Sequence, residues 1–280
     1  MSREIDRLAP PASKKKMKLV VASCSRTGTM GLHSALKILG YTPYHMVEVL
    51  KHGVPHMKVA QEAFLSANNR FSGIKRYERA ELDKWFDGYD CVLELPSYLG
   101  PRAIEAYIED PDIKFILTER DPAKWARSFS NTAGYVVDLA HSFPTNILKH
   151  FDSLNSAFLK LNEYAFWSMS DGTNKNHPNT DAALRNNYAE YIKTVKERLP
   201  KDRTLIVKLE DGLGWEQICP FLDVPIPDEP YPDANDQDNF QNIVGKFMHP
   251  GILAAWLRLG ALAVPSLGVM GFLGWRFLRS

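Results

Sequence analysis

Residues 19–30 read Leu-Val-Val-Ala-Ser-Cys-Ser-Arg-Thr-Gly-Thr-Met, and the rest of the chain is organised around them. The apolar, β-branched run Leu19–Val21 predicts a buried strand, and small polar residues follow it at once. Apolar side chains then recur at i, i+3, i+4 and i+7 from Leu32 to Leu39, which predicts a helix that ends at Gly40. A strand, a tight loop and a helix N-terminus aim backbone N–H groups and the helix dipole at one place, which suits a phosphate or sulfate.

The loop Ser25–Met30 carries further groups that suit an anion. Arg26 supplies a planar, bidentate donor, and Thr27 and Thr29 supply hydroxyls. The pattern is not the nucleotide-hydrolase loop G-x-x-x-x-G-K-[ST], because no lysine follows Gly28. Taken alone, it is equally compatible with an ordinary strand-to-helix turn that carries an incidental arginine.

The composition is typical of a globular protein with one domain. The 280 residues can bury a full core, and the formal net charge of +1 gives no reason to expect a nucleic-acid partner. Cys24, Cys91 and Cys219 lie far apart without metal-ligand spacing, so we expect free thiols and no metal. Cys24 lies in the anion loop, but no residue supplies a base for it, so we interpret it as a small filler.

A carboxylate ends the next short apolar strand. Cys91–Leu93 predicts a buried strand, and Glu94 follows it directly. Ligands of open α/β sheets bind at the carboxyl ends of strands, which makes Glu94 a candidate general base. Burial and a bound anion are expected to raise its pKa, and Arg26 is expected to oppose them. The alternative is a carboxylate that caps a helix beginning near Pro101.

A histidine is a further candidate for the catalytic site, beside Glu94 and Arg26. His45 follows a turn that contains Pro43, soon after the first strand, loop and helix. The chain can return there toward the anion site. A hydrogen-bonded structural histidine is the alternative.

A second candidate anion site follows the clearest strand of the chain, residues 113–118. Arg120 comes at the end of this strand, Pro122 suits the first turn of the next helix, and Ser128 lies two turns into it. An arginine and a hydroxyl placed in this way can hold a second phosphate near the first.

Strands and helices alternate along the chain, which predicts an α/β fold with a parallel sheet flanked by helices.

The two ends of the chain differ from its middle. Residues 1–16, with three successive lysines, predict a disordered basic arm, and residues 17–246 form the predicted α/β domain. In the hydrophobic tail, residues 250–278, the stretch Leu259–Trp275 carries no charge, and the tryptophans at 256 and 275 flank it. We expect a helical tail that associates with a membrane, either spanning it or lying in its plane, with the domain in the cytosol. A core or dimer-packing helix is the alternative.

Several of these motifs together resemble those of the sulfotransferase superfamily, which uses 3′-phosphoadenosine 5′-phosphosulfate (PAPS). The resemblance covers roughly Lys18–Asp236 and is strongest to the P-loop branch common in fungi. Ser25–Met30 matches the 5′-phosphosulfate loop, and Arg120-Asp121-Pro122 followed by Ser128 matches the 3′-phosphate motif. Tyr44-His45-Met46, Gly88-Tyr89-Asp90 before Glu94-Leu95-Pro96, and Gly214-Trp215 are similar to signatures of that branch.

The resemblance implies a function for each of these residues. The loop Ser25–Met30, with Arg26, would bind the 5′-phosphosulfate of PAPS, and Arg120 and Ser128 would bind its 3′-phosphate. Glu94 occupies the place where cytosolic members carry a catalytic histidine ahead of Leu-Pro, and would take the proton from an acceptor hydroxyl. No metal is required by this reaction.

Three departures from the family pattern leave other functions open. Arg26 replaces a lysine, Met30 replaces a hydroxyl, and no Arg-x-Gly element is evident near Asn239–Lys246. The first hypothesis is sulfation of a hydrophobic, hydroxylated small molecule in natural-product tailoring. The second is donor-free acid–base chemistry on a lipophilic metabolite, such as a cyclisation or an elimination. The third is a non-catalytic protein that binds a ligand or a partner at a membrane. A homodimer is compatible with each of them.

Overall fold

Five parallel strands form one sheet in the order β2-β3-β1-β4-β5. The structure is a computed structural model that describes residues 2–13, 15–232 and 240–277, with side chains described as far as residue 262. The strands are β1 (Leu19–Val21), β2 (Pro43–Tyr44), β3 (Cys91–Leu93), β4 (Lys114–Glu119) and β5 (Thr204–Lys208). The predicted α/β class and the parallel sheet are confirmed.

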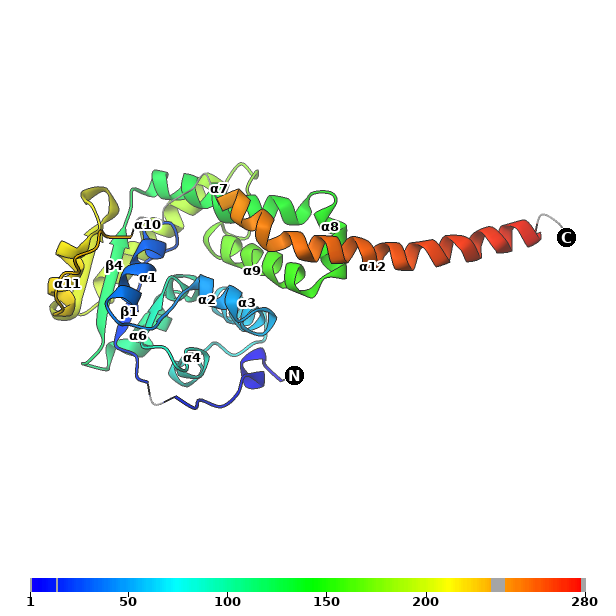
Figure 1. Ribbon diagram of the computed structural model, residues 1–280. Coiled ribbons are helices and arrows are strands. Elements are labelled where there is room, and N and C mark those ends of the chain that lie inside the picture. The colour runs from blue at the N-terminus through cyan, green and yellow to red at the C-terminus, as the bar shows by residue number, and fades with distance from the viewer. Residues whose placement is uncertain (1, 14, 233–239, 278–280) are drawn as a thin grey trace.

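Helices follow the strands and cover the sheet (Figure 1). The α-helices are α1 (Thr29–Ile38), α2 (Met46–Lys51), α3 (Val54–Asn68), α4 (Arg79–Trp85), α5 (Leu95–Leu99), α6 (Pro101–Ile108), α7 (Pro122–His141), α8 (Thr145–Leu148), α9 (Ser153–Met169), α10 (Thr180–Arg198), α11 (Trp215–Leu222) and α12 (Phe240–Phe277). The short 3-10 helices are η1 (Glu4–Arg7), η2 (Lys149–Phe151), η3 (Lys201–Arg203) and η4 (Leu209–Asp211).

The two faces of the sheet have separate cores because side chains alternate along each strand. On β1, Leu19 and Val21 pack with side chains of α1 and α11, such as Leu32 and Ile218. Val20 points to the opposite face and joins the larger core, which most of the remaining helices build. The neighbouring strands β1 and β3 are buried on both faces and are apolar throughout, as is usual for parallel sheets.

The chain between α1 and β3 contains two features that the sequence did not predict. Two separate helices, α2 and α3, follow each other here and are divided at Gly53, where φ is +71°. A glycine adopts this left-handed backbone without the steric cost that other residues meet. The edge strand β2 is only two residues long, too short to leave a periodic pattern in the sequence.

The N-terminal arm is more ordered than the sequence predicts. Glu4–Arg7 forms η1, and the side chain of Ile5 is 1% exposed in the main core. Arg3 pairs with Glu81 of α4 at 2.8 Å, and the backbone N–H of Glu4 donates to Glu62 of α3 at 2.8 Å. One buried side chain and two polar contacts therefore attach residues 3–7 to the domain. Met1 and Lys14 lie outside the described residues.

The helix α12 starts before the predicted boundary between domain and tail. It packs against α7, α8, α9 and η2, and its Met248 and Ala255 are buried. The Asn155 amide on α9 donates to the Met248 carbonyl at 3.1 Å, and Arg258 pairs with Asp152 at 3.5 Å. Packing against the domain thus continues to Arg258, well past residue 246. Beyond it α12 extends away from the other helices (Figure 1).

The predicted membrane tail falls largely on residues 263–277, whose side chains lie outside the described part of the chain. Among the residues that the structure describes, no helix is both long and apolar enough to cross a membrane.

Candidate active site

The loop between β1 and α1 has two residues with left-handed backbone. Gly28 is the residue before α1 and has φ +87°, and Arg26 has φ +66°. A Cβ on Gly28 would also lie 3.0 Å from Cδ1 of Leu209 and 3.2 Å from Cδ2 of Leu213. Both backbone conformation and space therefore require glycine here. The turn brings the N-terminus of α1, whose first N–H groups have no partner within the helix, to the carboxyl edge of the sheet.

Three side chains from the end of β4 and from α7 support this loop. The Trp125 indole donates to the Ser25 carbonyl at 2.8 Å, and the Arg120 guanidinium donates to the Arg26 carbonyl at 3.0 Å. The Thr27 hydroxyl donates to the Cys24 carbonyl at 2.7 Å and lies 2.7 Å from the Thr118 hydroxyl. Thr27 is thus turned inward, and its hydroxyl supports the loop instead of facing an anion as predicted.

Arg26 is the polar centre of the site. Its Nε donates to the Ser128 hydroxyl at 3.2 Å, whereas its Nη2 is buried and has no hydrogen-bond partner among the described residues. Burial lowers the pKa of Arg26, the negative charge of Glu94 raises it again, and the nearby Arg120 lowers it further. A buried, unpartnered guanidinium N–H is costly, and an anion is the group that removes the cost.

The two predicted anion sites lie in direct contact. Arg26 from the first motif touches both Ser128 and Arg120 from the second. The backbone N–H of Arg120 donates to the Tyr188 hydroxyl of α10 at 2.8 Å, which fixes the end of β4. Two guanidinium groups therefore lie close together at the carboxyl edge of the sheet. This arrangement suits a ligand with more than one negative charge.

Glu94 ends β3 in a left-handed backbone with φ +68°, and its side chain is 6% exposed. Its Oε2 lies 2.5 Å from Nε2 of His45 and accepts a hydrogen bond from the Thr29 hydroxyl at 3.3 Å. Its Oε1 accepts from the Tyr98 hydroxyl at 3.3 Å. Glu94 immediately precedes α5, but its side chain makes no capping hydrogen bond to that helix. The helix that begins at Pro101 is α6, and its N-cap residue is Gly100, so Glu94 does not cap that helix either.

The pKa of Glu94 differs from the sequence-based expectation. Burial raises it, but the contact with His45, the positive charge of Arg26 and the Tyr98 hydrogen bond together outweigh burial. The pKa of Glu94 therefore lies below its ordinary value, and the expected increase is wrong. The carboxylate is ionised at neutral pH, which is the state that a general base needs.

His45 reaches the anion loop, as the sequence predicts. The Val47 backbone N–H donates to Nδ1 of His45 at 3.3 Å, so Nδ1 carries no proton. Nε2 lies 2.5 Å from a carboxylate oxygen of Glu94 and 3.4 Å from the Thr29 hydroxyl oxygen. These contacts assign the Nε2–H tautomer. His45 thus contacts Glu94 through Nε2 and lies where it can orient the carboxylate.

An apolar cavity of about 240 Å³ adjoins this polar cluster. Ser25, Arg26, Thr29, His45, Glu94 and Tyr98 line one part of it. Its remaining walls come from α2, α7, α9 and the start of α12, and are mainly aliphatic and aromatic. The Met30 side chain is part of this apolar lining, although the sequence placed it among the anion ligands. The cavity therefore offers space for an apolar molecule next to a carboxylate and a cation.

Several residues of this site could not be identified from the sequence. Tyr98 lies four residues after Glu94, and the helix α5 brings the two side chains into contact at this spacing. No sequence motif identified Tyr98 as a site residue. Trp125 stacks on Tyr188 with ring centroids 4.4 Å apart. Trp125 contacts the anion loop, and Tyr188 contacts Arg120. The side chains of α12 that line the cavity were assigned to no role, because they follow a polar loop far from every motif.

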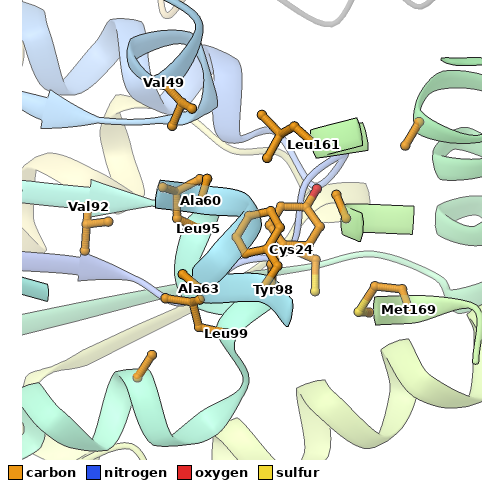
Figure 2. Close-up of a cluster of buried hydrophobic side chains, with 14 of the residues drawn as sticks. Cys24, Val49, Ala60, Ala63, Val92, Leu95, Tyr98, Leu99, Leu161 and Met169 are labelled. Carbon is orange, nitrogen blue, oxygen red and sulfur yellow. The ribbon is translucent and has the colours of Figure 1, made fainter. Parts of the chain in front are cut away.

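The cysteines have no catalytic surroundings. Cys24 is buried among apolar side chains that include Tyr98 and Met169 (Figure 2), and burial raises the pKa of its thiol far above the ordinary value. All three cysteines are free. Within the described part of the chain, no group of three or more His, Cys, Asp or Glu side chains could hold a metal ion.

Comparisons with known proteins identify a family, a relative and a solved structure that resemble this chain. The family model described as "Sulfotransferase domain" matches residues 18–240. A protein of Aspergillus versicolor, "Ava biosynthesis cluster protein M", is 31% identical over 225 residues, which cover 79% of this chain and 82% of that protein. A solved sulfotransferase from Alicyclobacillus acidocaldarius is 14% identical with a TM-score of 0.40, covering 88% of this chain and 95% of that one.

Replacing Arg26 by Met should raise the pKa of Glu94, because a positive charge that stabilises the carboxylate is lost. Carbon NMR titration of labelled glutamate carboxyl groups measures the change. A depressed carboxyl pKa stabilises the fold at pH values above the pKa of the unfolded chain, which is about 4.3 for glutamate. This stabilisation is lost as the pH falls through the pKa of the folded state. The variant should therefore lose less stability on acidification. Arg7→Met, at an arginine 60% exposed, is the matched control and should leave Glu94 unchanged.

Proposed function

The chain belongs to the sulfotransferase domain family, and from this premise we propose that it transfers a sulfuryl group from PAPS to the hydroxyl of a small lipophilic molecule. One observation carries the proposal. The unpartnered guanidinium nitrogen of Arg26 and the ionised carboxylate of Glu94 belong to the lining of the same apolar cavity. A cation and a base at one end of an apolar space are what this transfer needs.

The residues at the carboxyl edge of the sheet fit the charges of PAPS. Arg26, whose buried Nη2 needs an acceptor, and the N-terminus of α1 would bind the 5′-phosphosulfate. Arg120 and Ser128 would bind the 3′-phosphate, with Arg26 between the two groups. When bound, PAPS supplies the sulfuryl group. Arg26 stabilises the negative charge that develops on the departing phosphate side.

Glu94 acts on the acceptor. Its carboxylate takes the hydroxyl proton as the acceptor oxygen bonds to sulfur, and the bond between sulfur and the phosphate oxygen breaks with its electron pair remaining on that oxygen. The products are a sulfate ester and 3′-phosphoadenosine 5′-phosphate, and the proton stays on Glu94. His45 and Tyr98 hold the two carboxylate oxygens in place during this step.

The cavity restricts the acceptor to a small and largely apolar molecule. Its volume of about 240 Å³ lies just below the range of roughly 300–1,000 Å³ common for ligand pockets. Its polar groups are concentrated beside Glu94, so a single hydroxyl at one end of the acceptor meets them. The relative from Aspergillus versicolor is named for a biosynthesis cluster, which supports a role in natural-product tailoring.

Donor binding can be measured without knowing the acceptor. We expect 3′-phosphoadenosine 5′-phosphate to bind more tightly than 5′-AMP, which lacks the group that Arg120 and Ser128 would hold. Arg120→Ala removes a charge-assisted hydrogen bond, worth about 1.5–3 kcal/mol or roughly a ten- to hundredfold loss of affinity. Isothermal calorimetry gives these affinities, and Arg185→Ala, at an exposed arginine of α10, is the control.

Equal affinity for both nucleotides would contradict the use of PAPS. The buried network of Glu94, His45, Tyr98 and Thr29 is complete without a donor, and this observation favours acid–base chemistry as the second candidate function. Under that outcome, a cyclisation or elimination on a lipophilic metabolite becomes the leading proposal.

Replacing Glu94 by Gln should abolish most turnover. Gln keeps the shape of the side chain but cannot take a proton, so sulfation of a panel of small phenols should fall by roughly a hundred- to ten-thousandfold. Sulfate transfer from radiolabelled PAPS measures this loss, and calorimetry should find the nucleotide affinity little changed. Near-normal turnover in a folded Glu94→Gln variant would remove Glu94 from the mechanism, and equal loss of turnover and folding would indicate a structural role.

We further propose that α12 associates with a membrane surface, with the domain in the cytosol. Large apolar side chains are exposed along its described part: Leu253 (56%), Trp256 (46%), Leu257 (69%) and Leu262 (62%). Their spacing places 253, 256 and 257 on one face of the helix. The uncharged sequence Leu259–Trp275 continues from them, so lipid is the occupant that suits both segments.

Truncation after Leu262 tests this tail. The full chain should float with phosphatidylcholine vesicles even in high salt, because burial of apolar surface is not screened as ionic contacts are. The shortened chain should lose flotation yet keep its melting temperature. Truncation after Lys246 instead removes Phe247 and the buried Met248 and Ala255, and should destabilise the domain. Loss of stability in the first truncation, or a soluble full-length homodimer, would contradict membrane association.

A further inference from the structure

Two pairs of polar side chains join α1 to the start of α2. Thr29 and His33 lie one turn apart on α1, and His45 and Glu48 lie one turn apart at the start of α2. The first pair joins Thr29 to His45, with Oγ1 and Nε2 3.4 Å apart, and both also contact Glu94. The second pair joins His33 to Glu48. The first pair belongs to the candidate active site, but the second has no role in it so far.

The His33–Glu48 pair is nearly removed from water. His33 is 5% exposed and Glu48 is 6% exposed, and Nε2 of the histidine lies 2.9 Å from Oε2 of the carboxylate. The contact is close but not aligned as a hydrogen bond. The other oxygen of Glu48 accepts from Lys51 at 2.9 Å, and Lys51 is 58% exposed. One end of the cluster thus reaches the surface while the other lies beside His45.

Glu48 is ionised in this surrounding. Burial raises its pKa, but His33 and Lys51 lower it more, and the result is a pKa of about 2. Replacing a buried polar pair by apolar side chains of similar volume is often neutral for stability, because the pair must be desolvated on folding. Apolar side chains would join α1 and α2 at least as well. The pair therefore calls for an explanation other than stability, and its position beside His45 provides one.

The place of His45 in the chain makes it sensitive to α2. It is the residue directly before this six-residue helix, and its Nδ1 is held by a single N–H of that helix. The rings of His33 and His45 pack with centroids 5.3 Å apart. A shift of α2 along α1 would move His45 away from Glu94, and the second pair is one of the contacts that oppose such a shift.

We propose that His33 and Glu48 are positioning residues: they fix the start of α2 against α1, so that His45 keeps its Nε2–H directed at Glu94. This inference deepens the proposed function and rests on it for the role of Glu94 as base. Neither residue of the pair lines the cavity itself, and neither belongs to the anion loop. It therefore acts through His45, and should affect proton transfer without affecting donor binding.

Glu48→Gln tests the proposal, with Lys51→Gln as the matched control. Nitrogen NMR of the imidazole rings reports the tautomer of each histidine, and His45 is identified by its loss in a His45→Gln sample. In the full wild-type chain His45 should show two well-separated ring nitrogen shifts, as a fixed tautomer does. In Glu48→Gln the separation should fall by roughly half or more, because an unconstrained imidazole exchanges between tautomers. In Lys51→Gln it should not change.

The outcomes separate this inference from the proposed function, because the NMR measurement needs neither donor nor acceptor. A folded Glu48→Gln protein with unchanged His45 shifts would overturn the inference, as would averaged shifts in the wild type. If Glu48→Gln does not fold, His33→Gln decides the question by the same two criteria. Calorimetry with 3′-phosphoadenosine 5′-phosphate should find unchanged affinity in the folded variant. Phenol sulfation should lose kcat with little change in the donor KM.

Discussion

The site depends on two opposite charges, the partly buried guanidinium of Arg26 and the buried carboxylate of Glu94. Each shifts the pKa of the other, and Glu94 is held ionised although burial alone would favour its neutral form. Neither residue stands in ordinary backbone geometry, since both have positive φ values. Strain of this kind persists only where the surrounding structure enforces it, and here the carboxyl ends of β1 and β3 do so.

Other elements either support this pair or give it access to a ligand. The ends of β4 and α7 carry Arg120, Ser128 and Trp125, which hold the loop and leave one guanidinium nitrogen of Arg26 without a partner. The start of α2 carries His45, which orients Glu94. The walls of α7, α9 and α12 keep water from the carboxylate and make electrostatic contacts stronger than in solvent. One edge of the sheet thus combines anion binding, a base and an apolar space.

The helix α12 connects the cavity to the far end of the chain. Its first turns contribute Phe240 and Phe247 to the cavity wall, and Phe247 packs on Phe158 of α9 with ring centroids 4.8 Å apart. The same helix continues through exposed apolar residues into an uncharged stretch. The cavity wall and the distal part of α12 therefore belong to one continuous helix.

The sequence by itself determined the sheet, the anion loop and most of the residues at the strand ends. Leu19–Val21 and Cys91–Leu93 are apolar because both faces of the sheet are buried, so their composition reveals them directly. Only the tertiary structure decided the sign of the Glu94 pKa shift, the inward turn of Thr27 and the role of α12. These depend on which groups meet in space, such as His45 beside Glu94, and no local pattern of residues encodes distances between segments that far apart in the chain.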